Sequence, residues 1–387
     1  MSIPDLPVVV PNSRSVEEHD TEHGLVLASR GDALTPYLFA AASRRFRIAA
    51  EIDPELSELQ RYVVAALTIR PGRSRWVERF YKSSLATRMR SANASREVGA
   101  LRDKPEGVLQ VHALFSIEEV PSFLYVDCTH AQSARLWPAW NPLSGRALRE
   151  WYRREERTYA AAKHLFAFSA ATKYSLVEDY GLSPDKVTVT GAGVNFSQLP
   201  EIPVVGSYHG QEPPSILFVG NDFTRKGGPL LLEAFSQVRN IVPEARLRLV
   251  GLKPKISPQP GVDVIGLVKD RAFIADLYRH ATAFALPSIF DPYPLAALEA
   301  MSFELPVVAT RQMGTSEMIH DGVTGRLIEP GDVDALADAL IDLLLHPDAA
   351  ASMGKAARRD IEDRFTWDAV VDRMVPTLET FGMRTIS

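Results

Sequence analysis

Short apolar segments alternate with helical stretches along the second half of this 387-residue chain. Alternation of this kind is typical of βαβ units, whose strands join into a parallel sheet. We therefore expect an α/β, doubly wound, Rossmann-like domain from Ser215 onward. Its predicted strands are, in order, SILFVG, RLRLVG, VDVIG, AFALP and PVVAT.

The first half of the chain shows the same alternation less regularly. Its predicted strands are GLVLAS, FRIAAEI, GVLQVH, PSFLYVD, HLFAFS and KVTVTG, separated by helical stretches such as REWYRREERTYAAA. Between the halves, residues 199–214 are rich in proline and glycine, which is linker composition. Because a single core stops growing at roughly 250 to 300 residues, we expect two domains, 1–205 and 206–365.

Composition excludes several classes of protein. The net charge of −5 and a pI near 6.0 argue against general nucleic-acid binding, which requires a strongly basic domain. A single cysteine, Cys128, excludes an internal disulfide and a multi-cysteine zinc site. No run reaches the ~18 apolar residues of a membrane span, and the N-terminus lacks the features of a signal peptide. A cytoplasmic protein is expected.

The segment from Arg61 to Lys104 is strongly basic, with eleven Lys or Arg residues against three acids. Between residues 70 and 104 the apolar side chains among these cations follow a loose helical spacing and are Trp76, Phe80, Leu85 and Met89. One interpretation is a peripheral contact with an anionic membrane at its inner face. The other is the solvated face of a helix whose apolar side belongs to the core.

Residues 287–310, PSIFDPYPLAALEAMSFELPVVAT, contain two carboxylates in unusual surroundings. Asp291 lies in a Pro-rich loop, and Glu299 lies eight residues later inside an apolar helical run. A carboxylate in an apolar segment loses hydration worth several kcal/mol unless a polar group meets it. Loops at the carboxyl ends of strands are where open α/β sheets bind ligands. The segment therefore predicts a ligand site.

This segment resembles the family 4 glycosyltransferases, retaining enzymes of the two-domain GT-B type. The family pattern is a Glu, seven residues, a second Glu, then Ala-Met and a strand beginning Pro-Val-Val. Asp291 stands here in place of the first Glu, and Glu304 in place of the usual Gly. The resemblance implies two Rossmann-like doubly wound domains facing each other across a cleft. It also implies a C-terminal helix, over 366–387, that crosses back to the N-terminal domain.

The resemblance assigns roles to residues of the second domain. Glu299 would accept hydrogen bonds from the two ribose hydroxyls of a nucleotide, because a carboxylate offers acceptor sites only. Asp291 would bind a hydroxyl of the donor sugar. The donor sugar would also contact Tyr293, Pro294 and Leu295. The base would contact Gly266 and Val268, and the phosphates would contact Gly314 and Thr315.

Two cations follow the strand SILFVG in the turn NDFTRKGG. Arg225 and Lys226 lie where the strand passes into a helix, and exposed N–H groups at such a turn favour an anion. Fixed cations there would stabilise the diphosphate that leaves a nucleotide-sugar donor. Lys226 matches the family's lysine before Gly. Many members place an arginine at the position of Asn221, and Arg225 would substitute for it.

The catalytic group of the first domain has two candidates, Asp127 and His130, both near the end of the strand in PSFLYVDCTH. Many family members carry a His at the position of Asp127, and the choice between the two stays open. His112, in GVLQVHAL, is more typical of a hydrogen-bonded core histidine than of a ligand.

The function implied by the resemblance is retaining transfer of a sugar from a nucleotide diphosphate sugar to a hydroxyl acceptor. The acceptor could be a glycan, a lipid-linked sugar or a small molecule. No metal ion or other cofactor is expected, because the cations of the turn would stabilise the diphosphate in place of a metal ion. Two alternatives remain: a GT-B nucleotide-sugar epimerase, and a non-catalytic protein that binds a nucleotide sugar.

Overall fold

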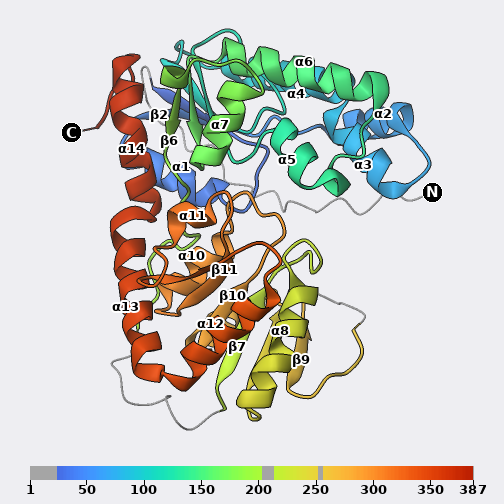
Figure 1. The fold of residues 1–387 in the computed structure, drawn as a ribbon. Helices are drawn as coiled ribbons and strands as arrows, with labels where there is room; N and C mark the ends of the chain where they lie inside the picture. The colour runs from blue at the N-terminus through green and yellow to red at the C-terminus, as the bar shows by residue number, and fades with distance from the viewer. Residues whose placement is uncertain (1–23, 203–212, 252–255, 387) are drawn as a thin grey trace. The chain divides into compact units, whose positions relative to one another are not determined.

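The computed structural model describes residues 24–202, 213–251 and 256–386. Contacts divide the chain into two units (Figure 1). The first unit runs to Gly191 and also takes in the residues from Val370 onward, and the second is Ala192–Ala369. The predicted boundary near residue 205 lies outside the described residues.

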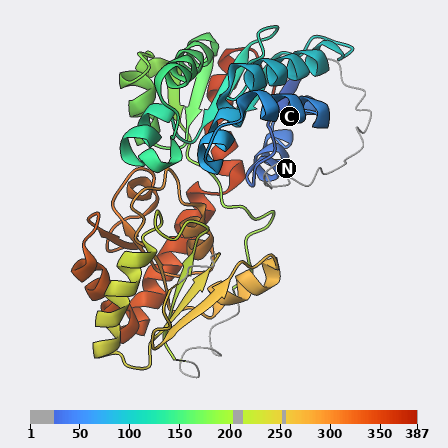
Figure 2. The same ribbon diagram turned by 90° about the vertical axis from the view of Figure 1, so that its right-hand side faces the viewer.

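The first unit is built on a six-stranded parallel sheet of order β2-β1-β3-β4-β5-β6, with helices on both faces (Figure 2). Its elements up to Val189 are β1 (Leu25–Ala28), α1 (Thr35–Ser43), β2 (Ile48–Ile52), α2 (Glu58–Thr68), α3 (Arg73–Lys82), α4 (Ser84–Gly99), β3 (Gly107–Val111), β4 (Ser122–Val126), α5 (His130–Leu136), α6 (Gly145–Ala161), β5 (His164–Ala167), α7 (Ala170–Glu178) and β6 (Val187–Val189).

The second unit has a parallel sheet of the same size, of order β12-β11-β10-β7-β8-β9. Its elements are β7 (Ser215–Val219), α8 (Gly228–Ile241), β8 (Arg246–Val250), β9 (Val262–Gly266), α9 (Arg271–Arg279), β10 (Ala283–Leu286), α10 (Leu295–Ser302), β11 (Val307–Thr310), α11 (Thr315–Met318), β12 (Gly325–Ile328), α12 (Val333–Leu345) and α13 (Pro347–Arg364). The α/β, doubly wound prediction is confirmed for both units.

The strands form where apolar residues run without interruption. Every residue of β1, β5, β10 and β11 is buried, as expected of strands covered by helices on both faces. The helices bury one side each, and several begin at a side-chain cap such as Ser169 of α7 or Asp270 of α9. The central strands therefore lie in the two cores, whereas the edge strands β2, β6 and β9 are mostly half-buried.

Each sheet reverses its winding at one point, which we call its switch point. In the first sheet β1 has β2 on one side and β3 on the other, and in the second β7 lies between β8 and β10. Connections leave the two strands at a switch point in opposite directions, which opens a crevice at their carboxyl ends. Ligands of open α/β sheets bind there, so the residues that follow β1, β3, β7 and β10 are candidate site residues.

The basic segment folds as three helices, α2, α3 and α4. The apolar side chains proposed for a bilayer pack instead into a cluster with the buried residues Leu56 and Val64: Phe80 is 4% exposed, and Trp76, Leu85 and Met89 are half-buried against it. The indole Nε1 of Trp76 donates to the carbonyl oxygen of Ala65 at 3.1 Å. The second interpretation is therefore correct for these four residues, because their apolar side belongs to the core.

The last helix, α14 (Trp367–Thr380), occupies the segment predicted for the terminal helix. From Val370 onward the chain belongs to the first unit. Arg45 forms an ion pair with Asp372 at 2.5 Å, and the ring of Phe381 lies 5.4 Å from that of Phe123 on β4. The first unit is thus made from both ends of the sequence.

Candidate active site

The turn between β7 and α8 is shaped by glycines. Gly227 has a left-handed backbone, with φ of 77°, and a Cβ atom there would lie 1.8 Å from the carbonyl oxygen of Pro287. A Cβ on Gly220 would lie 2.3 Å from Cδ of Lys226. Only glycine fits at position 227, because the turn passes so close to the backbone at the end of β10, and a side chain at position 220 would displace the lysine stem.

Both predicted cations meet Asp291. The ammonium of Lys226 lies 3.0 Å from Oδ2 of Asp291, and Nη1 of Arg225 lies 3.6 Å from the same oxygen. Arg225 also donates to the carbonyl oxygen of Phe290 at 2.7 Å and lies 3.4 Å from Asp222. Arg225 and Asp291 are only 8% and 6% exposed. The residues that follow β7 and β10 therefore converge at the second switch point, as the sequence predicted.

Glu299 lies on α10 beside this cluster and is mostly buried. Its Oε2 accepts from the hydroxyl of Tyr278 at 3.1 Å, and its Oε1 lies 3.7 Å from Nη1 of Arg271. Burial raises the pKa of the Glu299 carboxyl, and the charges of Arg271 and Lys226 act against that rise. The polar group expected to meet Glu299 is therefore supplied in this structure by Tyr278 and Arg271.

The loop after Asp291 packs against the start of α11. The N–H of Gly314 donates to the carbonyl oxygen of Pro292 at 3.3 Å, and a Cβ on Gly314 would meet the ring of Tyr293 at 2.4 Å. Thr315 is buried, and its hydroxyl donates to the carbonyl oxygen of Thr310 at 2.6 Å. The structure thus brings the loop after Asp291 into contact with Gly314 and Thr315. The N–H of Gly314 and the hydroxyl of Thr315 are already hydrogen-bonded within the protein.

Pro294 and Leu295 lie at the start of α10. The predicted positions Asn221, Gly266 and Val268 lie along the carboxyl edge of β7, β8 and β9. The N–H of Gly251 donates to the carbonyl oxygen of Gly266 at 2.8 Å, and a Cβ on Gly251 would lie 3.0 Å from the amide oxygen of Asn221. Val268 is half-buried just beyond this edge. Ser288, after β10, is 1% exposed, and its hydroxyl has no partner in the described part of the chain. It is a site residue that no sequence pattern indicated.

At the first switch point a histidine lies between two carboxylates. His112 follows β3, and its Nε2 lies 2.9 Å from Oδ2 of Asp32, which follows β1. Its Nδ1 lies 3.3 Å from Oδ1 of Asp127, which follows β4. The three side chains are 29%, 31% and 40% exposed, respectively. Asp127 thus lies where the sequence predicted, but its partners were not foreseen.

The electrostatics of this triad keep His112 charged. Burial alone would lower the pKa of His112, but the carboxylates of Asp127 and Asp32 outweigh it and raise the pKa to about 10. Burial would likewise raise the pKa of Asp32, and the hydrogen bond and charge of His112 outweigh that and lower it to about 2. Oδ1 of Asp32 accepts from the hydroxyl and N–H of Thr35, which fixes the carboxylate.

His112 also has a strained backbone, since its φ of 62° is left-handed in a residue with a Cβ. Its N–H donates to the carbonyl oxygen of Tyr125 at 3.0 Å, which holds this conformation. Strain of this kind costs on the order of 1–3 kcal/mol and is concentrated at functional sites. His112 is therefore not the hydrogen-bonded core histidine that the sequence predicted. It is an imidazolium held in a fixed orientation at the sheet edge.

His130, the competing candidate, lies in the interior of the first unit. It is 3% exposed, and its ring meets those of Trp151 and Tyr152 edge-on. Nδ1 of His130 lies 3.1 Å from the ammonium of Lys82. Burial and the nearby lysine lower the pKa of His130 to about 3, so this ring is neutral. Of the two candidates, only Asp127 lies at the accessible strand edge.

Residues 213–346 match the family model described as glycosyl transferases group 1. The match covers about a third of the chain and lies within the second unit. Among curated relatives of the chain, D-inositol 3-phosphate glycosyltransferase of Kribbella flavida is 32% identical over 248 residues. That match covers 58% of this chain and 58% of the relative, so the chain spans little more than half the length of the curated relatives it matches.

Solved structures are similar to this chain at the level of the fold. Sucrose-phosphate synthase from Thermosynechococcus elongatus has a TM-score of 0.65 at 17% identity, over 93% of this chain and 99% of that chain. HepE from Anabaena, in complex with UDP-glucose, has a TM-score of 0.62 at 16% identity, over 92% and 100%. The GT-B fold expected from the resemblance is confirmed.

The group 1 match contains Lys226, Asp291 and Glu299 and leaves the triad of the first unit outside it. Among residues 24–202, 213–251 and 256–386, no group of three or more His, Cys, Asp or Glu side chains is arranged to hold a metal ion. No helix within the same ranges is long and apolar enough to cross a bilayer.

Proposed function

We propose that this protein is a retaining glycosyltransferase that moves a sugar from a nucleotide diphosphate sugar to a hydroxyl acceptor. One observation carries the proposal. Lys226 and Arg225 converge on Asp291 at the second switch point, with Glu299 beside them, inside the segment that matches the glycosyl transferases group 1 family model. A diphosphate is the group that such a cationic pair recognises best.

The donor would exchange partners with the protein on binding. The diphosphate takes the place of the Asp291 carboxylate at Lys226 and Arg225. Asp291 is then released to accept a hydrogen bond from a sugar hydroxyl, and Glu299 accepts from the ribose. The two cations stabilise the charge that grows on the leaving diphosphate as the glycosidic bond breaks. We propose that this transfer needs no metal ion.

In the first unit, Asp127 would orient the acceptor hydroxyl. In a front-face retaining transfer, a phosphate oxygen of the donor accepts the proton of the attacking hydroxyl, so Asp127 need not be a strong base. The His112 imidazolium, held by Asp32, fixes one oxygen of Asp127. The other oxygen is left to accept a hydrogen bond.

The experiment is a donor screen. The protein is incubated with UDP-, GDP- and ADP-sugars, and the release of nucleoside diphosphate is measured with and without an extract containing acceptors. HepE was solved with UDP-glucose, which makes UDP-sugars the first to test. Slow release without acceptor and faster release with it are expected. If no donor is bound or turned over, the proposal fails.

Proton NMR of the sugar after the same incubation distinguishes transfer from its alternatives. An epimerase would convert the donor into an isomer without any acceptor. A protein that only binds nucleotide sugars would show saturable binding and no new product in any extract. Appearance of a glycosylated acceptor with retained anomeric configuration supports the transferase.

The proposal includes a cytoplasmic location and a peripheral contact with an anionic membrane, supported by the basic residues between 70 and 104. Their charge can attract anionic lipids. The apolar residues of that segment cannot take part, because they pack in the core.

A further inference from the structure

The outer face of α2 is apolar and exposed. Leu59, Tyr62, Val63 and Leu67 are 74%, 59%, 38% and 67% exposed. Their spacing of three, four and eight residues places them on one side of the helix. Ile69, directly after the helix, is 43% exposed and extends the patch. A helix on the surface of a globular domain normally has polar side chains on its outer face. The outer face of α2 has apolar side chains instead.

The opposite face of α2 is already used. Val64, Ala65 and Thr68 are buried, and the first two pack in the cluster that contains Phe80. α2 therefore carries two apolar faces, and the first unit covers only one of them. Figure 1 shows α2 at the margin of the first unit, beside α3.

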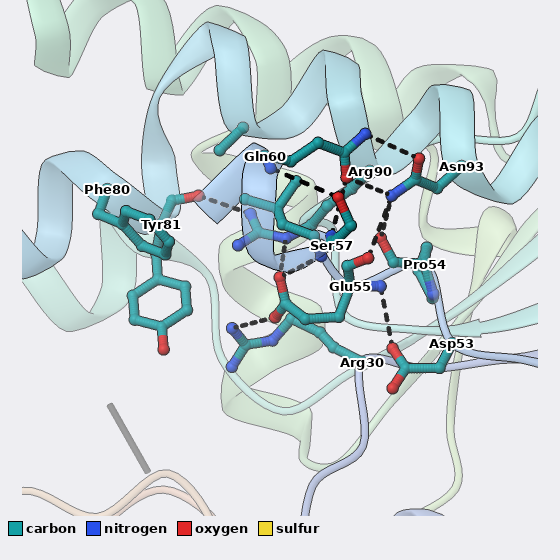
Figure 3. Close-up of polar contacts among 12 residues, drawn as sticks. Arg30, Asp53, Pro54, Glu55, Ser57, Gln60, Phe80, Tyr81, Arg90 and Asn93 are labelled. Carbon is teal, nitrogen blue, oxygen red and sulfur yellow. Dashed lines mark hydrogen bonds and ion pairs between the residues drawn. The ribbon is translucent and has the colours of Figure 1, made fainter. Parts of the chain in front are cut away.

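Hydrogen bonds fix α2 and the residues around it to the rest of the first unit. Ser57 and Gln60 form a capping box at its first turn. Gln60 and Asn93 of α4 exchange two hydrogen bonds, at 3.1 and 3.0 Å (Figure 3). The fully buried Arg90 donates to Glu55 at 3.1 Å and to the carbonyl oxygen of Tyr81 at 3.0 Å. The exposed stripe therefore lies on a fixed support.

The charges around the stripe are positive. Between residues 58 and 75 the only acid is Glu58, against four arginines. Arg70, Arg73 and Arg75 follow the apolar stripe directly, and all three are exposed. An apolar stripe next to a cluster of arginines is the pattern of a helix that lies in the plane of an anionic membrane interface.

We propose that the outer face of α2 docks on the surface of an anionic bilayer. The leucines enter the boundary between headgroups and acyl chains, Tyr62 lies at headgroup level, and the arginines pair with lipid phosphates. The inference rests on the peripheral membrane contact proposed above and supplies the apolar surface that residues 70–104 lack. It does not depend on glycosyl transfer.

A second copy of the chain is a poorer occupant. In a two-fold dimer the same patch would face itself, which brings Arg70, Arg73 and Arg75 of one copy close to those of the other. Like charges directly opposite one another oppose association. An anionic lipid surface meets the apolar stripe and the arginines at once.

The test is co-sedimentation with vesicles of phosphatidylcholine, with or without phosphatidylglycerol. The full chain is expected to bind the anionic vesicles, to bind the neutral ones far less, and to lose affinity as salt is added. The double variant L59Q/L67Q should bind the anionic vesicles at least about tenfold more weakly, since two leucine side chains no longer enter the interface. Gln keeps the helix propensity of the segment.

The matched control is I241Q/L345Q, which changes two residues of the second unit that are 58% and 51% exposed. This variant should bind vesicles as the unchanged chain does. Unfolding temperature and donor binding are measured on both variants, so that misfolding or loss of the donor site is recognised separately. Equal binding by L59Q/L67Q and the unchanged chain would overturn the proposal. So would a dimer in lipid-free solution that dissociates in L59Q/L67Q.

Discussion

The two switch points of the molecule carry opposite charge arrangements. In the first unit, one cation, the imidazolium of His112, lies between the carboxylates of Asp32 and Asp127. In the second, one carboxylate, Asp291, lies between Lys226 and Arg225. The two parallel sheets differ in strand order, and their edges differ in charge arrangement. We call the first edge negative and the second positive after the two groups that flank the central one in each case, and Asp222 also lies 3.4 Å from Arg225 at the second.

The difference shows how one architecture can serve two partners. The winding of the sheet decides where a site can lie, because it opens a crevice at the carboxyl ends of two strands. The side chains after those strands decide what binds. A pair of cations suits a diphosphate, and a pair of carboxylates suits hydroxyl groups, which donate hydrogen bonds to them.

The largest expected effect comes from removing a cation of the second unit. Lys226→Ala should lower the rate of nucleoside diphosphate release about 10²- to 10³-fold, the usual cost of losing one preorganised group that stabilises developing charge. Steady-state kinetics with the best donor measures it. Lys355→Ala, an exposed lysine of α13, is the control and should change the rate less than twofold, roughly the noise of such assays. Similar rates in both variants would remove the positive edge from the mechanism.

Removing the shared carboxylate tests the same edge through stability. Asp291→Ala leaves Lys226 and Arg225 without their common partner, and we expect a loss of about 3 kcal/mol in the free energy of unfolding, measured in urea. Asp263→Ala breaks an exposed pair with Arg246 and should cost less than about 1 kcal/mol. Pyrophosphate should stabilise Asp291→Ala more than the unchanged chain, and absence of that difference would contradict the exchange of partners.

The negative edge predicts an unusual titration. His112 should stay protonated from acid pH to beyond its ordinary value of 6.5, with its pKa near 10, while His130 stays neutral down to about 3. The ion pair of His112 with Asp32 therefore contributes stability that is fully present between pH 3.8, the ordinary value of Asp32, and pH 6.5. This stability is lost as pH rises through about 10 and as pH falls through about 2. NMR of the histidine rings measures both values.

The Asp32→Asn variant should shift the titration of His112 downward, because one of the two carboxylates is gone, and should leave His130 unchanged. His112→Gln should slow transfer by about tenfold with little change in donor binding, since it disturbs the orientation of Asp127 and leaves the second unit intact. An unshifted His112 titration in Asp32→Asn would show that the triad does not act as a unit.

The smallest effect concerns backbone strain outside either edge. Glu304 has φ of 58°, a left-handed conformation that glycine adopts without penalty. Glu304→Gly should therefore stabilise the fold by about 1 kcal/mol in thermal or urea unfolding. His112→Gly relieves a similar strain but loses both ion pairs, so it should not stabilise. A gain in both variants would mean that the strain at His112 is unrelated to its charged partners.

Residues that directly follow a predicted strand were the predictable part of the site. Lys226 and Arg225 follow SILFVG, and Asp291 follows AFALP. The carboxyl ends of parallel strands meet at one edge of a sheet, so their convergence followed from the alternation of elements and from the family resemblance. The central strands of both units were predictable from their apolar runs, since strands buried on both faces are nearly continuous apolar segments. Partly exposed strands such as β9 were predictable from the alternation of strands with helices.

Asp32 and His112 could not be paired from the sequence. They are far apart along the chain, and their contact depends on β1 and β3 being neighbours, which the order of elements alone does not reveal. A histidine at the end of an apolar strand reads like a core residue until its partners are known. The signal that could have found the pair is their shared position, directly after strands of one sheet.

The apolar residues of the basic segment show a different limit. Helical spacing indicates that Trp76 and Phe80 share one side of a helix, but not whether that side meets a core or the solvent. α2 carries apolar residues on two sides, so its sequence contains no polar face that would identify the outer one. Only the packing of the three helices showed that Leu59 and Leu67 point outward.

The return of the last helix to the first unit has a consequence for biosynthesis. Residues 192–369 are all made before the segment from Val370 onward, which completes the first unit. The first unit therefore lacks Val370, Val371 and Met374 from its core until the segment that contains them has been synthesised. The unit whose synthesis begins first therefore cannot complete its core until the whole of the other unit has been synthesised.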